Sequence, residues 1–206
     1  MREIKLFLIR HGKTYCNEKQ LYCGKSDVDL SENGICELGK LLKRSKFQKC
    51  DYYFTSGAKR ANKTLEILCP NAKYDILEKF FEYNFGEFEL KGYEELKFLK
   101  EYTNWIDDKE GNIKCPMGES RIEFRNRIRD TFIELIRYLV KEDIKSAFGV
   151  IHGGSIGIIL EMLYDDSKKF YEWQPKNGEG YELIIRVDEK NEFVIDEVNR
   201  QGGLHD

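Results

Sequence analysis

The segment Leu6-Phe7-Leu8-Ile9-Arg10-His11-Gly12 joins four consecutive apolar residues to a charged, glycine-containing stretch. A short apolar run of this kind predicts a buried strand, here over residues 3–9, that ends where the charge begins. Residues 147–151 predict a second buried strand, and His152-Gly153-Gly154 follows it directly. Because ligands bind at the carboxyl ends of the strands in open α/β sheets, the two histidines are expected at one site.

The rest of the chain continues this alternation of strands and helices. The expected elements are, in order, a helix after Ser31, a strand over 51–55, a helix from about Ala58, a strand over 72–77, a long helix from about Ser120, a helix from Gly153 through Leu163, and strands over 181–187 and 193–198. This order favours an α/β fold, and we predict a three-layer α/β/α sandwich with a mostly parallel central sheet. The segment at about 88–118 is polar and aromatic with weak periodicity, and we predict a small cap insertion there.

The composition limits the classes of protein that fit. The chain has 206 residues, of which 41% are hydrophobic and 34% charged, with a formal net charge of −3. We expect residues 1–206 to form a single domain. No run rich in Lys or Arg occurs, so neither a nucleic-acid nor a membrane partner is expected. The N-terminal apolar run is too short to span a membrane, and a cytoplasmic location is the expectation.

The six cysteines show no metal-site or disulfide pattern. None forms a CxxC pair and no histidine lies at zinc-finger spacing, so free thiols in a reducing compartment are expected. A catalytic thiol at Cys16 or Cys23 is the alternative to simple packing of these side chains. Carboxylates at metal-ligand spacing do not occur either, so we expect no metal and no cofactor.

Histidine chemistry carries the functional interpretation, and the chain has only three histidines. His205 is next to the last residue and is expected outside the site. A neutral imidazole, with an ordinary pKa of about 6.5, is a competent nucleophile near neutral pH. Phosphoryl transfer also needs cations around the equatorial oxygens, and Arg10 beside His11 supplies a guanidinium fork suited to phosphate. The alternative is two unrelated histidines at strand ends.

Further motifs follow in a fixed order along the chain. They are Arg10-His11-Gly12 with Asn17, Tyr22-Cys23-Gly24, Leu30-Ser31-Glu32-Asn33-Gly34, Arg60-Ala61, Phe81-Glu82 before Phe85-Gly86, Gly118-Glu119-Ser120, and Val150-Ile151-His152-Gly153-Gly154. Over about residues 4–164 this series resembles the histidine phosphatase superfamily, in its phosphoglycerate-mutase-like branch. The resemblance implies an α/β sandwich and a reaction that passes through a phosphohistidine.

The resemblance also implies roles for individual residues. His11 is the residue that becomes phosphorylated, and His152 contacts the phosphoryl group and adds positive charge when it is protonated. The residues implied to bind the substrate are Arg10, Asn17, Gly24, Arg60 and Gly153. The two arginines are the clamp, and they match a phosphate monoester, which carries nearly two negative charges at neutral pH.

Glu82 is the general acid that the resemblance implies. An alkoxide leaving group must take up a proton, and burial or a nearby anion would favour the protonated carboxyl that supplies it. Glu78 and Glu89 are competing candidates, and a surface glutamate without a role in chemistry is the alternative. Ser56 is expected either to contact the site or to cap the helix that carries Arg60.

The acceptor of the phosphoryl group separates two enzyme classes. Water gives a phosphatase, whereas a retained phosphoglycerate gives a mutase. Mutases of the family usually carry longer segments over the site, so we predict a phosphomonoesterase for a small metabolite, with a phosphoglycerate mutase as the alternative. Residues 116–120 resemble the branch that contains α-ribazole-5′-phosphate phosphatases and broad-specificity phosphatases. A non-catalytic phosphate-binding module is a third hypothesis, and the oligomeric state stays open, a homodimer included.

The aromatic residues of the 88–118 segment allow two interpretations. Tyr93, Phe98, Tyr102 and Trp105 either stack on a substrate ring or pack within the segment, and packing is favoured. Leu90 stands where the family often has glycine, which leaves the shape of that loop open.

Overall fold

A sheet of six strands, in the order β3-β2-β4-β1-β5-β6, lies at the centre of a computed structural model that describes residues 1–44 and 48–202. The strands are β1 (Arg2–Arg10), β2 (Tyr52–Thr55), β3 (Asp75–Ile76), β4 (Ser146–Ile151), β5 (Gly180–Val187) and β6 (Phe193–Gln201). β3, β2, β4 and β1 run parallel, and β5 is antiparallel to both of its neighbours. The prediction of a mostly parallel sheet is confirmed.

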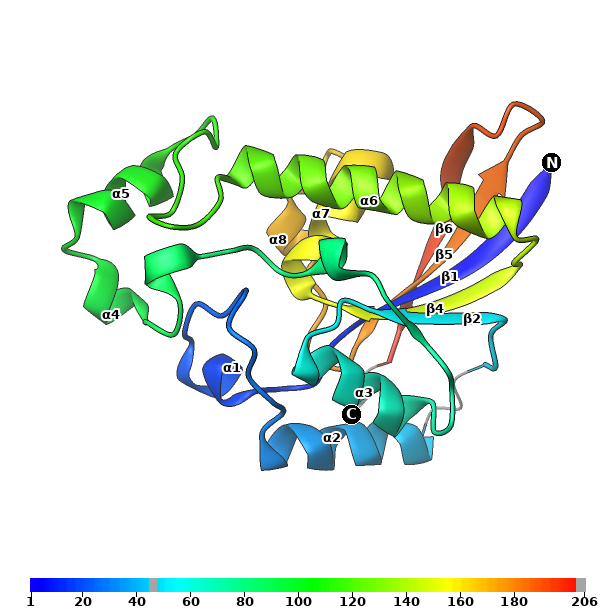
Figure 1. Ribbon diagram of the computed structural model, residues 1–206, viewed down its shortest axis with the longest axis horizontal. Coiled ribbons are helices and arrows are strands. Elements are labelled where there is room, and N and C mark those ends of the chain that lie inside the picture. Colours follow the sequence, from blue (N-terminus) through cyan, green and yellow to red (C-terminus); the bar gives the residue numbers. More distant parts are fainter. Residues whose placement is uncertain (45–47, 203–206) are drawn as a thin grey trace.

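Helices cover both faces of this sheet (Figure 1). The helices α6 (Arg121–Lys141), α7 (Gly153–Leu163) and α8 (Phe170–Trp173) lie over one face, and α2 (Glu32–Arg44) and α3 (Lys59–Leu68) lie over the other. The predicted three-layer α/β/α sandwich is therefore confirmed. The layers follow from the chain order. After each parallel strand the chain must return to the end of the sheet where that strand began, and it does so through a helix that crosses one face.

The strand β1 contributes side chains to the hydrophobic core on each face of the sheet. Its side chains alternate between the faces of the sheet, as the pleat of a strand requires. Ile4, Leu6 and Leu8 belong to the core on the α6 and α7 side, and Phe7 and Ile9 belong to the core on the α2 and α3 side. Because both faces are covered, the strand reads as a continuous apolar run. Each such buried side chain contributes about 1.5–3 kcal/mol to stability.

The long helix α6 begins at the predicted residue. Ser120 is its N-cap and accepts a hydrogen bond from the Glu123 backbone N–H, while the Glu123 carboxylate accepts from the Ser120 N–H. Its buried face carries Phe124, Ile128, Thr131, Phe132, Leu135, Ile136 and Leu139. Ile122 is apolar but lies off this face and is 43% exposed. Two residues before Phe124 it points to the opposite side of the helix, since successive helical residues are about 100° apart.

The 88–118 segment projects beyond one end of the sheet (Figure 1). It begins at the end of the 3₁₀ turn η2 (Gly86–Phe88) and contains the helices α4 (Tyr93–Leu96) and α5 (Lys100–Asp107). Tyr102 and Trp105 are buried in the core, whereas Tyr93 is 60% and Phe98 86% exposed. Tyr102 and Trp105 are therefore packing residues, and they join the segment to Tyr22 and Tyr83 outside it. The favoured interpretation is confirmed for these two residues.

Three local features differ from, or extend, the expectations. The third strand is only Asp75–Ile76 rather than 72–77, and as an edge strand it has a single neighbour, β2. The stretch 10–30, where no helix or strand was predicted, contains the short helix α1 (Tyr15–Lys19). Leu90 has a φ of 61°, in the left-handed region that favours glycine, which explains why its position suits the glycine common in the family.

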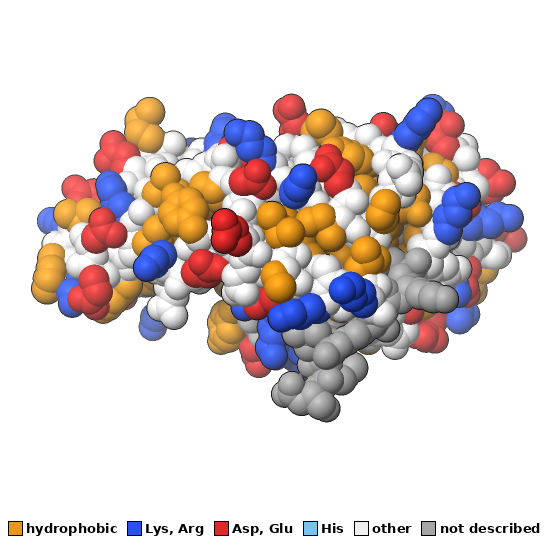
Figure 2. Space-filling model, turned by 90° about the horizontal axis from the view of Figure 1, so that it is seen from below, with side chains coloured by type: hydrophobic (Ala, Val, Ile, Leu, Met, Phe, Trp, Pro, Cys, Tyr) orange, Lys and Arg blue, Asp and Glu red, His pale blue; other side chains and the backbone are white. Residues whose placement is uncertain are grey.

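The surface carries charges of both signs. On the face shown in Figure 2, acidic and basic side chains are interspersed over the surface. Positive charge able to hold a phosphate must therefore be concentrated locally. Within residues 1–44 and 48–202, no helix is both long enough and apolar enough to cross a membrane.

Candidate active site

The two histidines at strand ends lie side by side. β1 and β4 are neighbouring parallel strands, with Arg10 in register with Ile151, so the residues that follow each strand emerge together. The His11 and His152 ring centroids are 5.2 Å apart with 65° between the ring planes. Both side chains are buried. The expectation of one shared site is therefore met, and the alternative of two unrelated histidines is wrong.

The hydrogen bond of His11 fixes which nitrogen is free. Its Nδ1 lies 2.7 Å from the carbonyl oxygen of Gly12, which can only accept, so Nδ1 carries the hydrogen. The neutral ring then keeps its lone pair on Nε2. The Gly12 backbone is itself held, because its N–H donates to Thr64 Oγ1 at 2.9 Å. These two hydrogen bonds fix the orientation of the His11 ring at the end of β1.

His152 is held between a hydroxyl and a guanidinium. Its Nε2 lies 2.8 Å from Ser56 Oγ, and its Nδ1 lies 3.4 Å from Nη2 of Arg60. Arginine can only donate, so Nδ1 accepts and Nε2–H donates to the serine hydroxyl. Ser56 therefore contacts the site. It does not cap α3, whose N-cap residue Ala58 makes no side-chain cap.

Arg60 and Arg10 bring positive charge to the histidines. Arg60 is buried and its two terminal nitrogens donate to the carbonyl oxygens of Ser26 at 2.8 Å and Gly24 at 2.6 Å. Arg10 donates to the carbonyl oxygen of Pro175 at 2.9 Å. Nε of each arginine is buried and has no hydrogen-bond partner within the described part of the chain. Buried donors without partners are rare in proteins, and an anion would satisfy them.

Burial and positive charge control the protonation of both histidines. Burial first, and then the nearby Arg60 guanidinium, lower the pKa of His11 and of His152 well below the ordinary histidine value. His11 therefore keeps a neutral, nucleophilic ring below neutral pH. The same shift favours a neutral His152 ring, so Arg10 and Arg60 are the positive charges beside the two histidines. A charge on His152 when a substrate is bound stays a prediction.

Glu82 reaches this site from the stretch after the 3₁₀ turn η1 (Glu78–Phe80). Its Oε2 accepts from the Gly154 N–H at 2.8 Å and its Oε1 from its neighbour Tyr83 N–H at 3.0 Å. The carboxyl thus lies at the start of α7, two residues from His152. Of the competing candidates, Glu89 is occupied elsewhere, because its carboxylate accepts backbone N–H groups from residues 24–26 and 85.

The glycines after His152 allow close approach of two of these side chains. A Cβ at Gly153 would lie 3.0 Å from the guanidinium carbon of Arg10, and a Cβ at Gly154 would lie 2.5 Å from Oε1 of Glu82. A side chain at either position would push the arginine or the acid away. The role of Gly153 as a backbone donor to substrate stays a prediction.

We expect Gly154→Ala to lower kcat/KM for alkyl phosphates by about ten- to a hundredfold, because the new methyl group displaces the Glu82 carboxyl by an ångström or so. Gly39→Ala is the matched control: a Cβ there meets nothing within 4 Å, and the residue lies inside α2. The control should keep full activity and gain about 0.5–1 kcal/mol of stability. Equal activity of the two variants would show that Glu82 needs no such space.

Asn17 and Gly24 make hydrogen bonds to other residues of the protein. The Asn17 side-chain oxygen accepts from the Thr14 N–H at 3.0 Å and closes the capping box of α1. The Gly24 carbonyl oxygen accepts from Arg60. Direct contact of either residue with substrate stays a prediction.

Asn177 is a site residue that the sequence did not reveal. Its Nδ2 donates to the carbonyl oxygen of His11 at 3.1 Å and lies 3.3 Å from Oδ1 of Asn17. Asn177 follows α8, outside every motif of residues 4–164, so no local signal marks it. It links the segment that contains His11 to the chain before β5.

A cavity of about 560 Å³ opens beside Glu82. Its lining residues are Lys25, Asp27, Ser56, Gly57, Ile76, Glu78, Phe81, Glu82, Asn84, Glu119 and Arg127. None of the aromatic residues Tyr93, Phe98, Tyr102 and Trp105 lines it, so none is placed to stack on a substrate there. The cavity thus adjoins the candidate acid and Ser56, the hydrogen-bond partner of His152, whereas the two histidines, Arg10 and Arg60 are not among its lining residues.

The thiol alternative concerned Cys16 and Cys23, and Cys16 is buried within α1. Burial raises the pKa of the Cys23 thiol to about 12, the opposite of an activated thiolate. Across residues 1–44 and 48–202, no group of three or more His, Cys, Asp or Glu side chains is arranged to hold a metal ion.

Known proteins are similar to this chain in sequence and in fold. The chain is 25% identical to a broad-specificity phosphatase of Saccharomyces cerevisiae, over 98% of this chain and 88% of that one. It is 29% identical to a 2,3-bisphosphoglycerate-dependent phosphoglycerate mutase of Buchnera aphidicola, over 84% and 89%. The structure is similar to that of the α-ribazole phosphatase of Shigella flexneri, with a TM-score of 0.78, 22% identity and coverage of 95% and 96%.

A family model supplies the assignment. Residues 6–200 match the model of the histidine phosphatase superfamily, branch 1. The match extends past the last of the sequence motifs and includes Asn177. This chain belongs to the histidine phosphatase superfamily.

Proposed function

We propose that the protein is a phosphomonoesterase that hydrolyses a small phosphorylated metabolite through a phosphohistidine on His11. The observation that carries this proposal is Nε2 of His11, oriented by the Nδ1–H bond to Gly12 and placed beside His152, the buried Arg60 and the half-buried Arg10. An oriented nucleophile, fixed cations and an acid close to one another are the parts that phosphoryl transfer requires.

In the first step Nε2 of His11 attacks phosphorus in line with the leaving oxygen. The phosphorus–oxygen ester bond breaks, and its electron pair goes to the leaving oxygen, which takes the proton of the Glu82 carboxyl. Arg10 and Arg60 hold the equatorial oxygens of the phosphoryl group. The Nδ1–H bond to Gly12 stays in place and stabilises the charge that the ring acquires.

In the second step water attacks the phosphohistidine. The Glu82 carboxylate accepts a proton from that water, and the phosphorus–nitrogen bond breaks with its electron pair returning to Nε2. Inorganic phosphate leaves, and both His11 and Glu82 regain their first states. The acid of one half-reaction is the base of the other.

Water as the acceptor, rather than a second hydroxyl, makes this protein a phosphatase. The open cavity beside Glu82 and the modest 88–118 segment, which we propose as a cap within one domain of 1–206, support this choice. A phosphoglycerate mutase is the second candidate, because a mutase is among the similar proteins. A phosphate-binding module without catalysis would not need both histidines and the acid.

α-Ribazole 5′-phosphate is one candidate substrate. We also propose that the enzyme needs no metal ion and acts in the cytoplasm.

A metabolite panel tests the proposal. We expect phosphate release from one or more members of a panel that includes α-ribazole 5′-phosphate, 3-phosphoglycerate and p-nitrophenyl phosphate, with EDTA causing no loss. Acid quenching during turnover should trap an acid-labile phosphohistidine. Conversion of 3-phosphoglycerate to its isomer without phosphate release would favour the mutase, and a strict metal requirement would contradict the mechanism.

A further inference from the structure

The general acid lies on a stretch of chain without regular structure. Glu82 stands between the 3₁₀ turns η1 and η2, and neither a strand nor a helix includes residues 81–85. A carboxyl that must protonate a leaving oxygen has to be held within a few tenths of an ångström, because a displacement of about 1 Å can cost a hundredfold in rate. Contacts from outside this stretch must therefore position Glu82.

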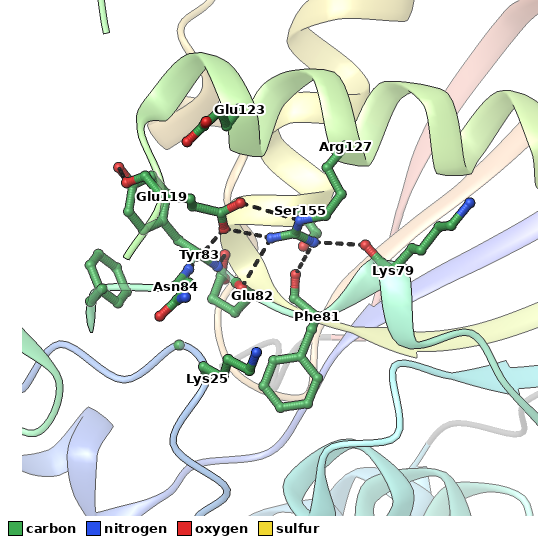
Figure 3. A network of polar contacts seen from close by, with 12 residues as sticks. Lys25, Lys79, Phe81, Glu82, Tyr83, Asn84, Glu119, Glu123, Arg127 and Ser155 are labelled. Atoms are coloured by element: carbon green, nitrogen blue, oxygen red, sulfur yellow. Dashed lines mark hydrogen bonds and ion pairs between the residues drawn. The ribbon is translucent and has the colours of Figure 1, made fainter. Parts of the chain in front are cut away.

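Arg127, on the first half of α6, binds the backbone on which Glu82 sits (Figure 3). Its Nη1 donates to the carbonyl oxygens of Lys79 at 2.7 Å and Phe81 at 2.8 Å. Its Nη2 donates to the carbonyl oxygen of Glu82 itself at 3.4 Å. One guanidinium thus binds three backbone oxygens within four residues.

Glu119 fixes that guanidinium in turn. Its Oε1 lies 2.6 Å from Nη2 of Arg127 and its Oε2 lies 3.3 Å from Nε. Oε1 also accepts from the Asn84 N–H at 2.8 Å, so the same carboxylate binds the chain on the other side of Glu82. Figure 3 shows Glu119 and Arg127 meeting above the 79–84 stretch. A half-buried pair with these extra bonds holds a more definite geometry than a surface ion pair.

The donor inventory of Arg127 argues against direct substrate binding. A guanidinium has five N–H donors, and the five acceptors are Lys79 O, Phe81 O, Glu82 O and the two oxygens of Glu119. Although Arg127 lines the cavity, no donor remains for a phosphate or a carboxylate. Arg127 thus contacts this stretch from α6. From α7, the Gly154 N–H donates to the Glu82 carboxylate and Ser155 Oγ donates to the carbonyl oxygen of Phe80 at 3.3 Å.

We propose that Arg127 and Glu119 are positioning residues that act on the reaction through Glu82. This inference rests on the proposed function, in which Glu82 is the acid. Its consequence is selective, because a displaced acid slows the departure of poor leaving groups and hardly affects good ones. A substrate-binding arginine would instead affect all phosphate esters alike.

A double-mutant cycle tests the proposal. We expect Arg127→Ala to lower kcat/KM by about 30-fold for the best alkyl phosphate of the panel, and by less than about threefold for p-nitrophenyl phosphate. In a Glu82→Gln background the same substitution should cost less than about threefold on either ester, because the group it positions is already disabled. Arg129→Ala is the matched control, since it removes another α6 arginine and its ion pair with Asp130. The control should leave both rates unchanged.

Equal losses from Arg127→Ala in the two backgrounds, or on the two esters, would overturn the proposal. If Arg127→Ala does not fold, Glu119→Gln is compared in the same two backgrounds and on the same two esters, because it keeps the size of the side chain but loses its charge.

Amide hydrogen exchange tests the positioning role without a measurement of turnover. Exchange of Tyr83 and Gly154, whose N–H groups donate to Glu82, should become faster in Arg127→Ala and stay unchanged in Arg129→Ala. Unchanged exchange would overturn the positioning role, whereas absence of turnover by the unaltered protein would overturn only the proposed function.

Discussion

Replacing His11 with alanine is expected to lower phosphate release from p-nitrophenyl phosphate by on the order of 10⁴-fold or more. The reason is that Nε2 of His11 is the atom that forms the covalent bond to phosphorus. His152 cannot take its place, since its Nδ1 faces Arg60 and its Nε2 faces Ser56. The trapped phosphohistidine should disappear together with the turnover, which links the loss to the nucleophile.

A second variant separates chemistry from folding. In His11→Asn the side-chain amide retains an N–H donor for the carbonyl oxygen of Gly12, which the His11 ring contacts through Nδ1. We expect this variant to be as inactive as His11→Ala while its melting temperature stays close to that of the unaltered protein. Near-normal turnover by either variant would exclude His11 as the nucleophile.

The sheet and the pairing of the histidines could be predicted because both depend on local patterns. The apolar run before His11 and the run before His152 identify buried strands, and parallel strands end at the same edge of a sheet. Arg10 pairs with Ile151 in the structure, so the histidine that follows each of these residues emerges at the same end of the sheet. The same reasoning predicted β3 too long, because an edge strand with one neighbour needs only a few paired residues.

The supporting residues could not be predicted, because their roles arise from contacts between distant segments. In the sequence Arg127 is one of several basic residues on an amphipathic helix, and only the fold brings its guanidinium to residues 79–82. Asn177 reaches His11 across 166 positions of the chain. The pKa of His152 also depends on its burial and on the nearby Arg60, and neither can be derived from the sequence motifs.

Glu82→Gln is expected to lower kcat/KM for alkyl phosphates by about 10²–10⁴-fold, the usual contribution of a general acid. Glutamine keeps the shape of the side chain and an oxygen that can accept from the Gly154 N–H, but it has no proton to give to the leaving oxygen. For p-nitrophenyl phosphate the loss should be below about tenfold, because its phenolate leaves with little help.

The comparison must be made in kcat/KM, because Glu82 has a second role after the leaving group has gone. The glutamine variant also lacks a base for the attacking water, so hydrolysis of the phosphohistidine slows for every substrate and lowers kcat for all of them alike. kcat/KM reports only the steps through transfer to His11, where the leaving group still matters. We therefore expect the variant to accumulate phosphohistidine from p-nitrophenyl phosphate in a burst. Equal losses in kcat/KM on both esters would remove Glu82 as the acid, and Glu78, which lines the same cavity, would be the next carboxyl to replace.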